Sequence, residues 1–302
     1  MMNARMRHLV TRREALGLSL GAIAILTANR SARAAETGTE GAFAERIAML
    51  EARSGDRLGI AVFDSGSGKR LAYRGEELFP MCSTFKFLAA AAILARVDAG
   101  KERLDRRLSY GPSDLLEYAP VTKEHAGEGS MTLEALCAAA VEMSDNTAAN
   151  LLLQVLGGPS GITAFCRSLG DDKTRLDRIE PFLNEALPGD QRDTTTPVAM
   201  LGCMDRLFLG DALTPGSRAH LEGWMINAKP GAKRLPAAIP EGARIGHKTG
   251  TGERGTSNDI AIVWPAGGKP VLIAAYLTGS PRKTEERDAV IAEAGKIAFA
   301  SL

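Results

Sequence analysis

The residues best suited to nucleophilic chemistry lie in the tetrapeptide Ser83-Thr84-Phe85-Lys86. A serine hydroxyl is a weak nucleophile unless a neighbouring base accepts its proton. Positions i and i+3 share one face of a helix, so the Lys86 amine is expected near the Ser83 hydroxyl. A serine in the first turn of a helix also has an unpaired backbone N–H, which suits the stabilisation of an oxyanion. By itself the pattern is weak, because Ser280 and Lys283 repeat the spacing where a helix cap is the better interpretation.

Two other short motifs carry polar groups that suit a binding site. Ser144-Asp145-Asn146 lies between two helical patterns, where all three residue types also serve as helix caps. Lys248-Thr249-Gly250 falls in a β-rich segment and supplies a cation, a hydroxyl and a small residue. Such a strand edge could bind a substrate carboxylate, and it could equally be a surface strand that ends in a turn. Taken singly, each motif leaves a structural role open.

Apolar periodicity predicts the elements that must position these motifs. Strands are expected at residues 58–63, 70–73, 260–264 and 271–277, and helices at 43–50, 85–97, 133–143, 147–156, 162–169 and 197–209. A last helix is predicted to open at Ser280-Pro281. The stretch 250–255 fits GxGxxG, but the strand pattern after it favours a hairpin turn over a nucleotide-binding loop.

This order of elements predicts an α+β fold. Strands at both ends imply an antiparallel β-sheet built from both termini and flanked by helices, with an inserted all-α lobe. We assign residues 35–76 and 227–302 to the α/β lobe and residues 77–226 to the all-α lobe. The active site is expected in the cleft between the two lobes.

Residues 1–34 have the composition of a cleaved export signal. A basic segment precedes an apolar run from Leu16 to Thr27, which is too short to span a bilayer, and Ala32-Arg33-Ala34 offers a small-residue cleavage site. Arg12-Arg13 favours the twin-arginine type, with an ordinary signal as the alternative. The protein is therefore expected in the periplasm or secreted, with no membrane segment after cleavage.

The rest of the composition limits the kinds of partner that the protein is expected to bind. Residues after the signal carry more acids than bases, and only 5% of the chain is aromatic, which argues against a nucleic-acid partner. The cysteines form no CxxC pair and the histidines show no metal-ligand spacing, so we expect no metal and no cofactor. Four buried thiols are favoured over disulfides at these positions: Cys82, Cys137, Cys166 and Cys203.

The three motifs together, in this order, indicate a function more strongly than any one of them alone. SxxK, SDN and KTG are the set found in class A β-lactamases and penicillin-binding proteins. Over its whole mature length the sequence resembles a class A serine β-lactamase. The stretch from Arg178 to Asn184 also matches the omega-loop pattern of that family.

The resemblance implies roles for residues at matching positions. Ser83 would be the nucleophile and Ser144 the proton relay to the lactam nitrogen, while Lys86 and Glu180 remain alternative bases for acylation. Glu180 and Asn184 would hold the deacylating water in a loop closed by an Arg178–Asp193 ion pair. Backbone N–H groups of Ser83 and Thr251 would form the oxyanion hole. The remaining substrate contacts would come from Asn146, Lys248, Thr249, Thr251 and Tyr118, with Gly250 as a structural residue beside them.

Three positions depart from the family pattern. Ser257 stands where many members carry a carboxylate-binding arginine, and we assign that role to Arg234, with a plain surface charge as the alternative. Cys82 precedes the nucleophile as in members with a disulfide across the site, but its partner position is Gly252. Cys137 matches another disulfide position whose partner is here Ala90. Neither bridge is expected.

The resemblance predicts a monomeric hydrolase that acts on small-molecule β-lactams without a cofactor. A D-Ala-D-Ala peptidase with the same nucleophile is one alternative, and Glu180 with Asn184 argues against it. A non-catalytic β-lactam sensor is the other, and it would be expected to have a membrane anchor and to lack the deacylating glutamate.

Overall fold

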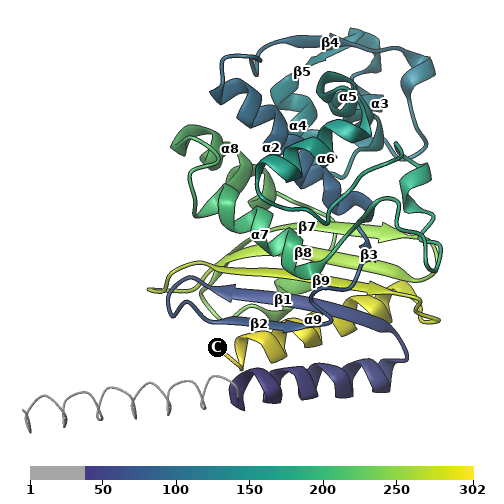
Figure 1. Ribbon diagram of the computed structural model, residues 1–302. Helices are drawn as coiled ribbons and strands as arrows, with labels where there is room; N and C mark the ends of the chain where they lie inside the picture. The colour runs from purple at the N-terminus through teal and green to yellow at the C-terminus, as the bar shows by residue number, and fades with distance from the viewer. Residues whose placement is uncertain (1–37) are drawn as a thin grey trace, which may run out of the picture. The chain divides into compact units, whose positions relative to one another are not determined.

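The first and last strands of the chain lie together in one five-stranded antiparallel sheet (Figure 1). A computed structural model of the protein describes residues 38–302. The strands run in the order β2 (Arg70–Tyr73), β1 (Arg57–Asp64), β9 (Val271–Thr278), β8 (Thr256–Trp264) and β7 (Arg244–Gly252). Strand β1 forms a hairpin with β2 and also pairs along its whole length with β9. The predicted α+β fold, with a sheet assembled from both ends of the sequence, is confirmed.

The two faces of the sheet belong to two separate apolar clusters. Because side chains alternate across a strand, Ile60 and Val62 face one cluster while Ala61 faces the other. The first cluster also contains Phe43 and Ile47 from the helical residues 43–54, and it is completed by the last helix, α9 (Thr284–Phe299). Two terminal helices therefore cover one face, as predicted.

Helix α9 begins later than the sequence suggested. The prediction that Ser280 caps it with Pro281 in the first turn is wrong, because the helix starts at Thr284. Lys283 is the N-cap residue, and its backbone N–H donates to the Glu286 carboxylate at 3.0 Å. The Ser280 hydroxyl instead accepts a hydrogen bond from the Arg282 backbone N–H.

Helices from the middle of the chain cover the opposite face. Helix α2 is apolar on nearly all sides and packs among α4, α5, α6 and α8, while α7 packs on β1 and β9. The predicted helices are confirmed within a few residues at their ends. Their bounds are α2 (Phe85–Asp98), α4 (Leu133–Glu142), α5 (Asn146–Leu156), α6 (Pro159–Ser168) and α7 (Pro197–Phe208).

Helix α8 (Pro215–Ile226) was not predicted from the sequence, and neither was the single turn of α3 (Pro120–Glu124). Two glycines in α8 dilute its apolar periodicity, although Leu221, Trp224 and Met225 are buried. The Thr214 hydroxyl caps α8 by accepting from the Ser217 backbone N–H. Two short ladders complete the strands: β3 (Phe79–Pro80) with β6 (Thr194–Thr195), and β4 (Arg107–Ser109) with β5 (Ser130–Thr132).

The predicted export signal, residues 1–34, lies outside the described residues. Residues 43–302 form one unit, which holds every candidate site residue. No helix within residues 38–302 is long and apolar enough to cross a membrane. All four cysteines fall in this part of the chain, and all four are buried and free.

Candidate active site

The candidate nucleophile lies where a tight turn enters a buried helix. Ser83 belongs to the short 3-10 helix η1 (Cys82–Thr84), which continues directly into α2. Lys86, in the first turn of α2, places its Nζ 2.9 Å from Ser83 Oγ. The backbone of Cys82 just before the serine is left-handed, with φ of 46°. Such a conformation is sparsely populated by residues with a side chain and is often found at functional sites.

The Lys86 ammonium group is buried and is held by acceptors of which only Asn146 is partly exposed. Its Nζ donates to the Ser144 carbonyl oxygen at 2.8 Å and to Asn146 Oδ1 at 2.6 Å, and lies 2.9 Å from Glu180 Oε1. Burial lowers the pKa of Lys86, and the Glu180 carboxylate acts in the opposite direction. The lowered pKa brings Lys86 closer to the neutral form, which can accept a proton from Ser83.

The Ser144-Asp145-Asn146 segment serves as a cap and as part of the site. Asp145 is the N-cap of α5, and its carboxylate accepts hydrogen bonds from the backbone of Ala148 and of Thr122. This fixed turn gives Ser144 a positive φ of 57°. As a result the Ser144 hydroxyl lies 3.4 Å from Lys86 Nζ.

Strand β7 forms the opposite wall of the site from one edge of the sheet. Lys248 is buried, and its Nζ donates to Ser144 Oγ at 2.9 Å and to the Thr249 carbonyl oxygen. Burial, followed by the charge of Lys86, holds the pKa of Lys248 well below its usual range. Gly250 is required here, because a Cβ would lie 2.7 Å from the Met81 carbonyl oxygen.

Arg234 is a buried residue rather than a surface charge. It is 4% exposed, and its guanidinium group forms an ion pair with Asp288 at 2.7 Å. The same group donates to the Gly250 carbonyl oxygen and, at 2.9 Å, to Thr251 Oγ1. Arg234 therefore reaches the end of β7 that carries the exposed Thr251. Ser257, on β8, accepts a hydrogen bond from Arg287.

Glu180 completes the site from a loop almost a hundred residues further along the chain. Its Oε1 accepts a hydrogen bond from Ser83 Oγ at 3.3 Å, and its Oε2 accepts one from Asn184 Nδ2 at 2.5 Å. The Glu180 backbone bonds the Asn150 side chain through both its N–H and its carbonyl oxygen, each at 3.0 Å. Among the described residues nothing bonds the buried Oδ1 of Asn184.

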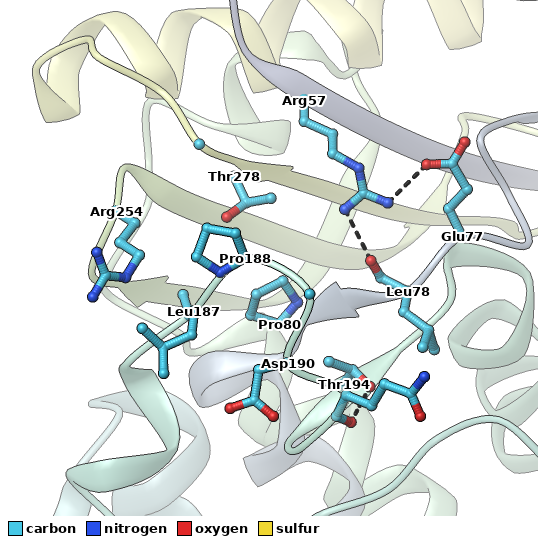
Figure 2. A pocket seen from close by; sticks show the side chains of 14 residues that line it. Arg57, Glu77, Leu78, Pro80, Leu187, Pro188, Asp190, Thr194, Arg254 and Thr278 are labelled. Carbon is cyan, nitrogen blue, oxygen red and sulfur yellow. Dashed lines mark hydrogen bonds and ion pairs between the residues drawn. The ribbon is translucent and has the colours of Figure 1, made fainter.

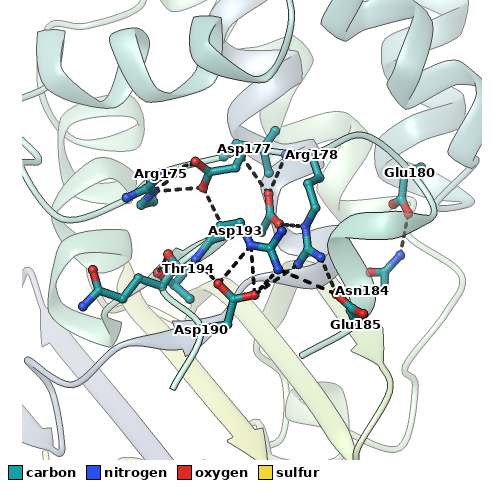
Figure 3. A network of polar contacts seen from close by, with 12 residues as sticks. Arg175, Asp177, Arg178, Glu180, Asn184, Glu185, Asp190, Asp193 and Thr194 are labelled. Atoms are coloured by element: carbon teal, nitrogen blue, oxygen red, sulfur yellow. Dashed lines mark hydrogen bonds and ion pairs between the residues drawn. The ribbon is translucent and has the colours of Figure 1, made fainter. Parts of the chain in front are cut away.

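A polar network closes this loop at its base (Figure 3). Arg178 Nε donates to Asp193 Oδ2 at 2.6 Å, so the predicted ion pair is present. The other oxygen of the buried Asp193 accepts the backbone N–H groups of Asp177 and Arg178. The Asp193 carbonyl oxygen accepts the N–H of Met81, two residues before Ser83. The loop base and the nucleophile turn are therefore joined directly.

The remaining predicted positions also lie at this site. Tyr118 is 51% exposed, and its carbonyl oxygen accepts the backbone N–H of Asn146. Positions 82 and 252 are adjacent, since a Cβ on Gly252 would lie 2.6 Å from Cys82 Sγ. Burial raises the pKa of the Cys82 thiol, and the charge of Glu180 raises this pKa further, so the thiol is protonated.

A separate cavity of about 510 Å³ lies under the far part of the loop (Figure 2). Leu187, Pro188 and Asp190 line it on the loop side, with Arg57 and Arg254 opposite. None of the predicted site residues lines this cavity.

Sequence reasoning did not identify three residues that position the site. Asp145 fixes the turn that holds Ser144, Asn150 fixes the backbone of Glu180, and Asp288 pairs with Arg234. Asp145 stands inside a recognised motif and was available as a candidate. Asn150 and Asp288 carry no local signal, because their partners lie far from them in the sequence.

The chain is similar to known proteins over most of its length. Residues 42–302 match the model of the family described as "Beta-lactamase enzyme family". The β-lactamase OXY-2 of Klebsiella oxytoca is 45% identical over 84% of this chain and 87% of its own, and CTX-M-8 of Citrobacter amalonaticus is 46% identical over the same shares. A solved class A β-lactamase described as the last common ancestor of Gram-negative bacteria superposes with a TM-score of 0.84 at 58% identity, covering 86% of this chain and 99% of that chain.

The fold brings a serine hydroxyl, a lysine amine and a carboxylate into mutual contact. With these similarities, the chain belongs to the class A β-lactamases, the enzymes that hydrolyse β-lactams.

Proposed function

We propose that this β-lactamase works through a covalent ester on Ser83, which a water activated by Glu180 then hydrolyses. One observation carries the proposal. Ser83 Oγ, Lys86 Nζ and Glu180 Oε1 form a closed triangle with sides of 2.9, 2.9 and 3.3 Å. Hydrogen-bond distances of this kind are what proton transfer from a nucleophile requires.

Acylation begins when Ser83 Oγ attacks the lactam carbonyl carbon. Its proton passes to Lys86 or to Glu180, both of which lie within reach. Backbone N–H groups of Ser83 and Thr251 stabilise the oxyanion. The C–N bond of the ring then breaks, and Ser144 delivers a proton to the departing nitrogen, supported by the Lys248 amine at 2.9 Å.

Deacylation needs a base beside the new ester. Glu180 and Asn184 are joined through Glu180 Oε2, and the unbonded Asn184 Oδ1 is a second acceptor next to it. Both groups would orient one water toward the ester carbonyl. Glu180 takes a proton from the water while the water oxygen bonds to the ester carbonyl carbon. The ester C–O bond to Ser83 then breaks, the proton returns to Ser83 Oγ, and the ring-opened acid leaves.

The substrate carboxylate is assigned to the β7 side of the pocket. This strand carries Lys248, Thr249 and Thr251, and Arg234 adds a second positive charge next to Thr251. Asn146 is assigned to the amide of the substrate side chain and Tyr118 to the rim of the pocket. No step in this cycle requires a cofactor.

The decisive experiment removes the deacylating base. Glu180→Ala should leave an acyl-enzyme that gains the full mass of a penicillin in intact-protein mass spectrometry, and kcat should fall by at least about 100-fold. Glu124→Ala is the control, because this exposed acid on α3 lies outside both the triangle and the loop. Rapid turnover by Glu180→Ala would overturn the proposed role.

Ser83→Ala should abolish the mass increase altogether. A D-Ala-D-Ala peptidase would instead show a long-lived penicillin adduct in the unsubstituted protein, together with cleavage of a peptide ending in D-Ala-D-Ala. A sensor would show the same adduct without cleaving either substrate.

We further propose that residues 1–34 direct twin-arginine export to the periplasm or outside the cell. The mature chain would act there as a monomer with its active site between an α/β lobe and an all-α lobe, bound to neither nucleic acid nor membrane. Replacing Arg12 and Arg13 by lysine should leave the protein in the cytoplasmic fraction. Unchanged export after this replacement would favour an ordinary signal.

A further inference from the structure

Two buried cysteines and an aspartate meet away from the catalytic triangle. Cys166 comes from α6, Cys203 from α7, and Asp171 from the segment that follows α6. Their two Sγ atoms and a carboxylate oxygen all lie within 4.8 Å of one another. Cys166 and Cys203 are at most 1% exposed, and Asp171 is 8% exposed. Within residues 38–302 no other three cysteine, histidine or acidic side chains converge in this way.

We propose that Cys166, Asp171 and Cys203 bind one thiophilic divalent cation of the Zn²⁺ type. Zn²⁺ prefers four tetrahedral ligands, with sulfur at about 2.3 Å and carboxylate oxygen at about 2.1 Å. Those bond lengths place a sulfur and an oxygen ligand about 3.6 Å apart. Cys203 Sγ and Asp171 Oδ2 are 3.4 Å apart, so little movement is needed to accommodate the ion.

The carboxylate is already oriented toward the thiols. Asp171 Oδ1 accepts the backbone N–H groups of Lys173 at 2.8 Å and Thr174 at 3.0 Å, which leaves Oδ2 facing Cys203. Arg167 holds the same turn by donating to the carbonyl oxygens of Asp171 and Thr174. Carboxylates that bind metals are commonly fixed by such outer hydrogen bonds.

A groove that is open to solvent reaches one of these side chains, Asp171. It has a volume of about 410 Å³, and Asp171 lines it together with Gly170 and Gly202, the neighbour of Cys203. An ion can therefore approach the site from the Asp171 side, although neither thiol lines the groove, and a water next to Asp171 can supply the fourth ligand. A metal site needs an entry path, and here Zn²⁺ would need a fourth ligand beyond the three side chains.

A disulfide between Cys166 and Cys203 is the competing interpretation. It would remove the thiol that donates to Asp171 Oδ2. The carboxylate oxygen would then be left without that donor in a nearly buried position, which is unfavourable. A cation satisfies all three groups together, while the two thiol protons pass to solvent buffer and both sulfurs stay at the thiolate oxidation level.

The sequence did not predict this site, because its residues match no zinc-binding spacing. The ligands come from separate elements, and folding brings them together. Since α6 packs on α2 and α7 packs on the sheet, a bound ion would join two parts of the core at the start of the segment that leads to Glu180. We therefore expect metal binding to stabilise the fold without taking part in the hydrolysis.

Titration of the chelator-treated, fully reduced enzyme with Cd²⁺ tests the proposal. One equivalent should produce the ultraviolet charge-transfer band of cadmium–thiolate bonds, and Zn²⁺ should compete for the site and raise the melting temperature. Cys166→Ser and Cys203→Ser should each reduce the band and weaken binding. Asp171→Asn keeps the Oδ1 hydrogen bonds possible and should weaken binding at least about tenfold.

Cys137→Ser is the matched control, because Cys137 is also buried and free but lies in α4. It should bind Cd²⁺ as the unsubstituted enzyme does. Absence of the band, or equal binding by Asp171→Asn and the unsubstituted enzyme, would overturn the proposal even if a serine variant failed to fold. The proposal would also be overturned if only two of the four thiols titrated in a denatured, non-reduced sample, since the other two would then form a disulfide.

Discussion

The two halves of the loop between Asp177 and Arg192 are held in different ways. In the first half, residues 177–184, Asn150 of helix α5 bonds the Glu180 backbone, and Leu183 is 1% exposed in the main core. In the second half, residues 185–192, Asp190 pairs with Arg192 two residues away, and Leu187 borders the cavity of about 510 Å³. The first half is positioned by the rest of the molecule, whereas the ion pairs of the second half come from the loop's own residues, Arg178 of the first half among them.

The difference between the two halves follows from the position of Glu180 in the first half. A catalytic carboxylate must keep its geometry to within a fraction of an ångström, and that precision requires partners on rigid elements. Helix α5 and the nucleophile turn supply those partners for Glu180. The second half carries no candidate catalytic group, so the same substitution should cost less there.

The largest effect is expected where the first half is anchored. Asp193→Ala removes a buried carboxylate that accepts from Arg178 and from two backbone N–H groups. Breaking such a buried pair from one side costs about 3–5 kcal/mol. Urea denaturation should show this loss in the free energy of unfolding. Asp205→Ala, which removes an acid paired with the half-exposed Arg70 outside the loop, should cost less than about 1 kcal/mol.

A matched pair of leucines compares the halves directly. Leu183→Ala should cost about 3 kcal/mol, because it leaves a void in a packed core. Leu187→Ala should cost less than about 1.5 kcal/mol, since this side chain is only partly buried and already borders open space. Thermal or urea unfolding of the two variants provides the measurement. Equal losses would mean that the second half is packed as firmly as the first.

The sequence predicted the fold well where apolar residues formed long runs. The longer sheet strands are continuous runs that are buried on both faces, and helices such as α2 and α4 carry many buried apolar residues. It missed α8, where glycines interrupt the repeat, and placed the start of α9 too early at Pro281. In that second case a carboxylate three residues beyond the N-cap residue caps the helix, and the proline lies before it.

For the site, short motifs identified individual residues, but the partners of these residues lie far away in the sequence. Ser83 and Lys86 could be related by helical spacing, but only the folded chain brings Glu180 to the same point. Asn150 and Asp288 could not be found, because a single buried amide or carboxylate carries no pattern of its own. The cluster of Cys166, Asp171 and Cys203 was missed for the same reason.

The smallest effect is expected from a surface pair in the second half of the loop, and it depends on pH. Hydrogen bonds from Arg192 lower the pKa of Asp190 from 3.8 to about 2. A carboxyl group with a lowered pKa in the folded state contributes its full stabilisation above pH 3.8, and this contribution is lost as the pH falls through about 2. Because the Arg192 side chain is 46% exposed, Asp190→Asn should cost less than about 1 kcal/mol at pH 7, and this cost should vanish as the pH falls below about 2. Urea midpoints for both proteins across this range should converge at low pH, and a constant difference would show that Asp190 acts through packing rather than charge.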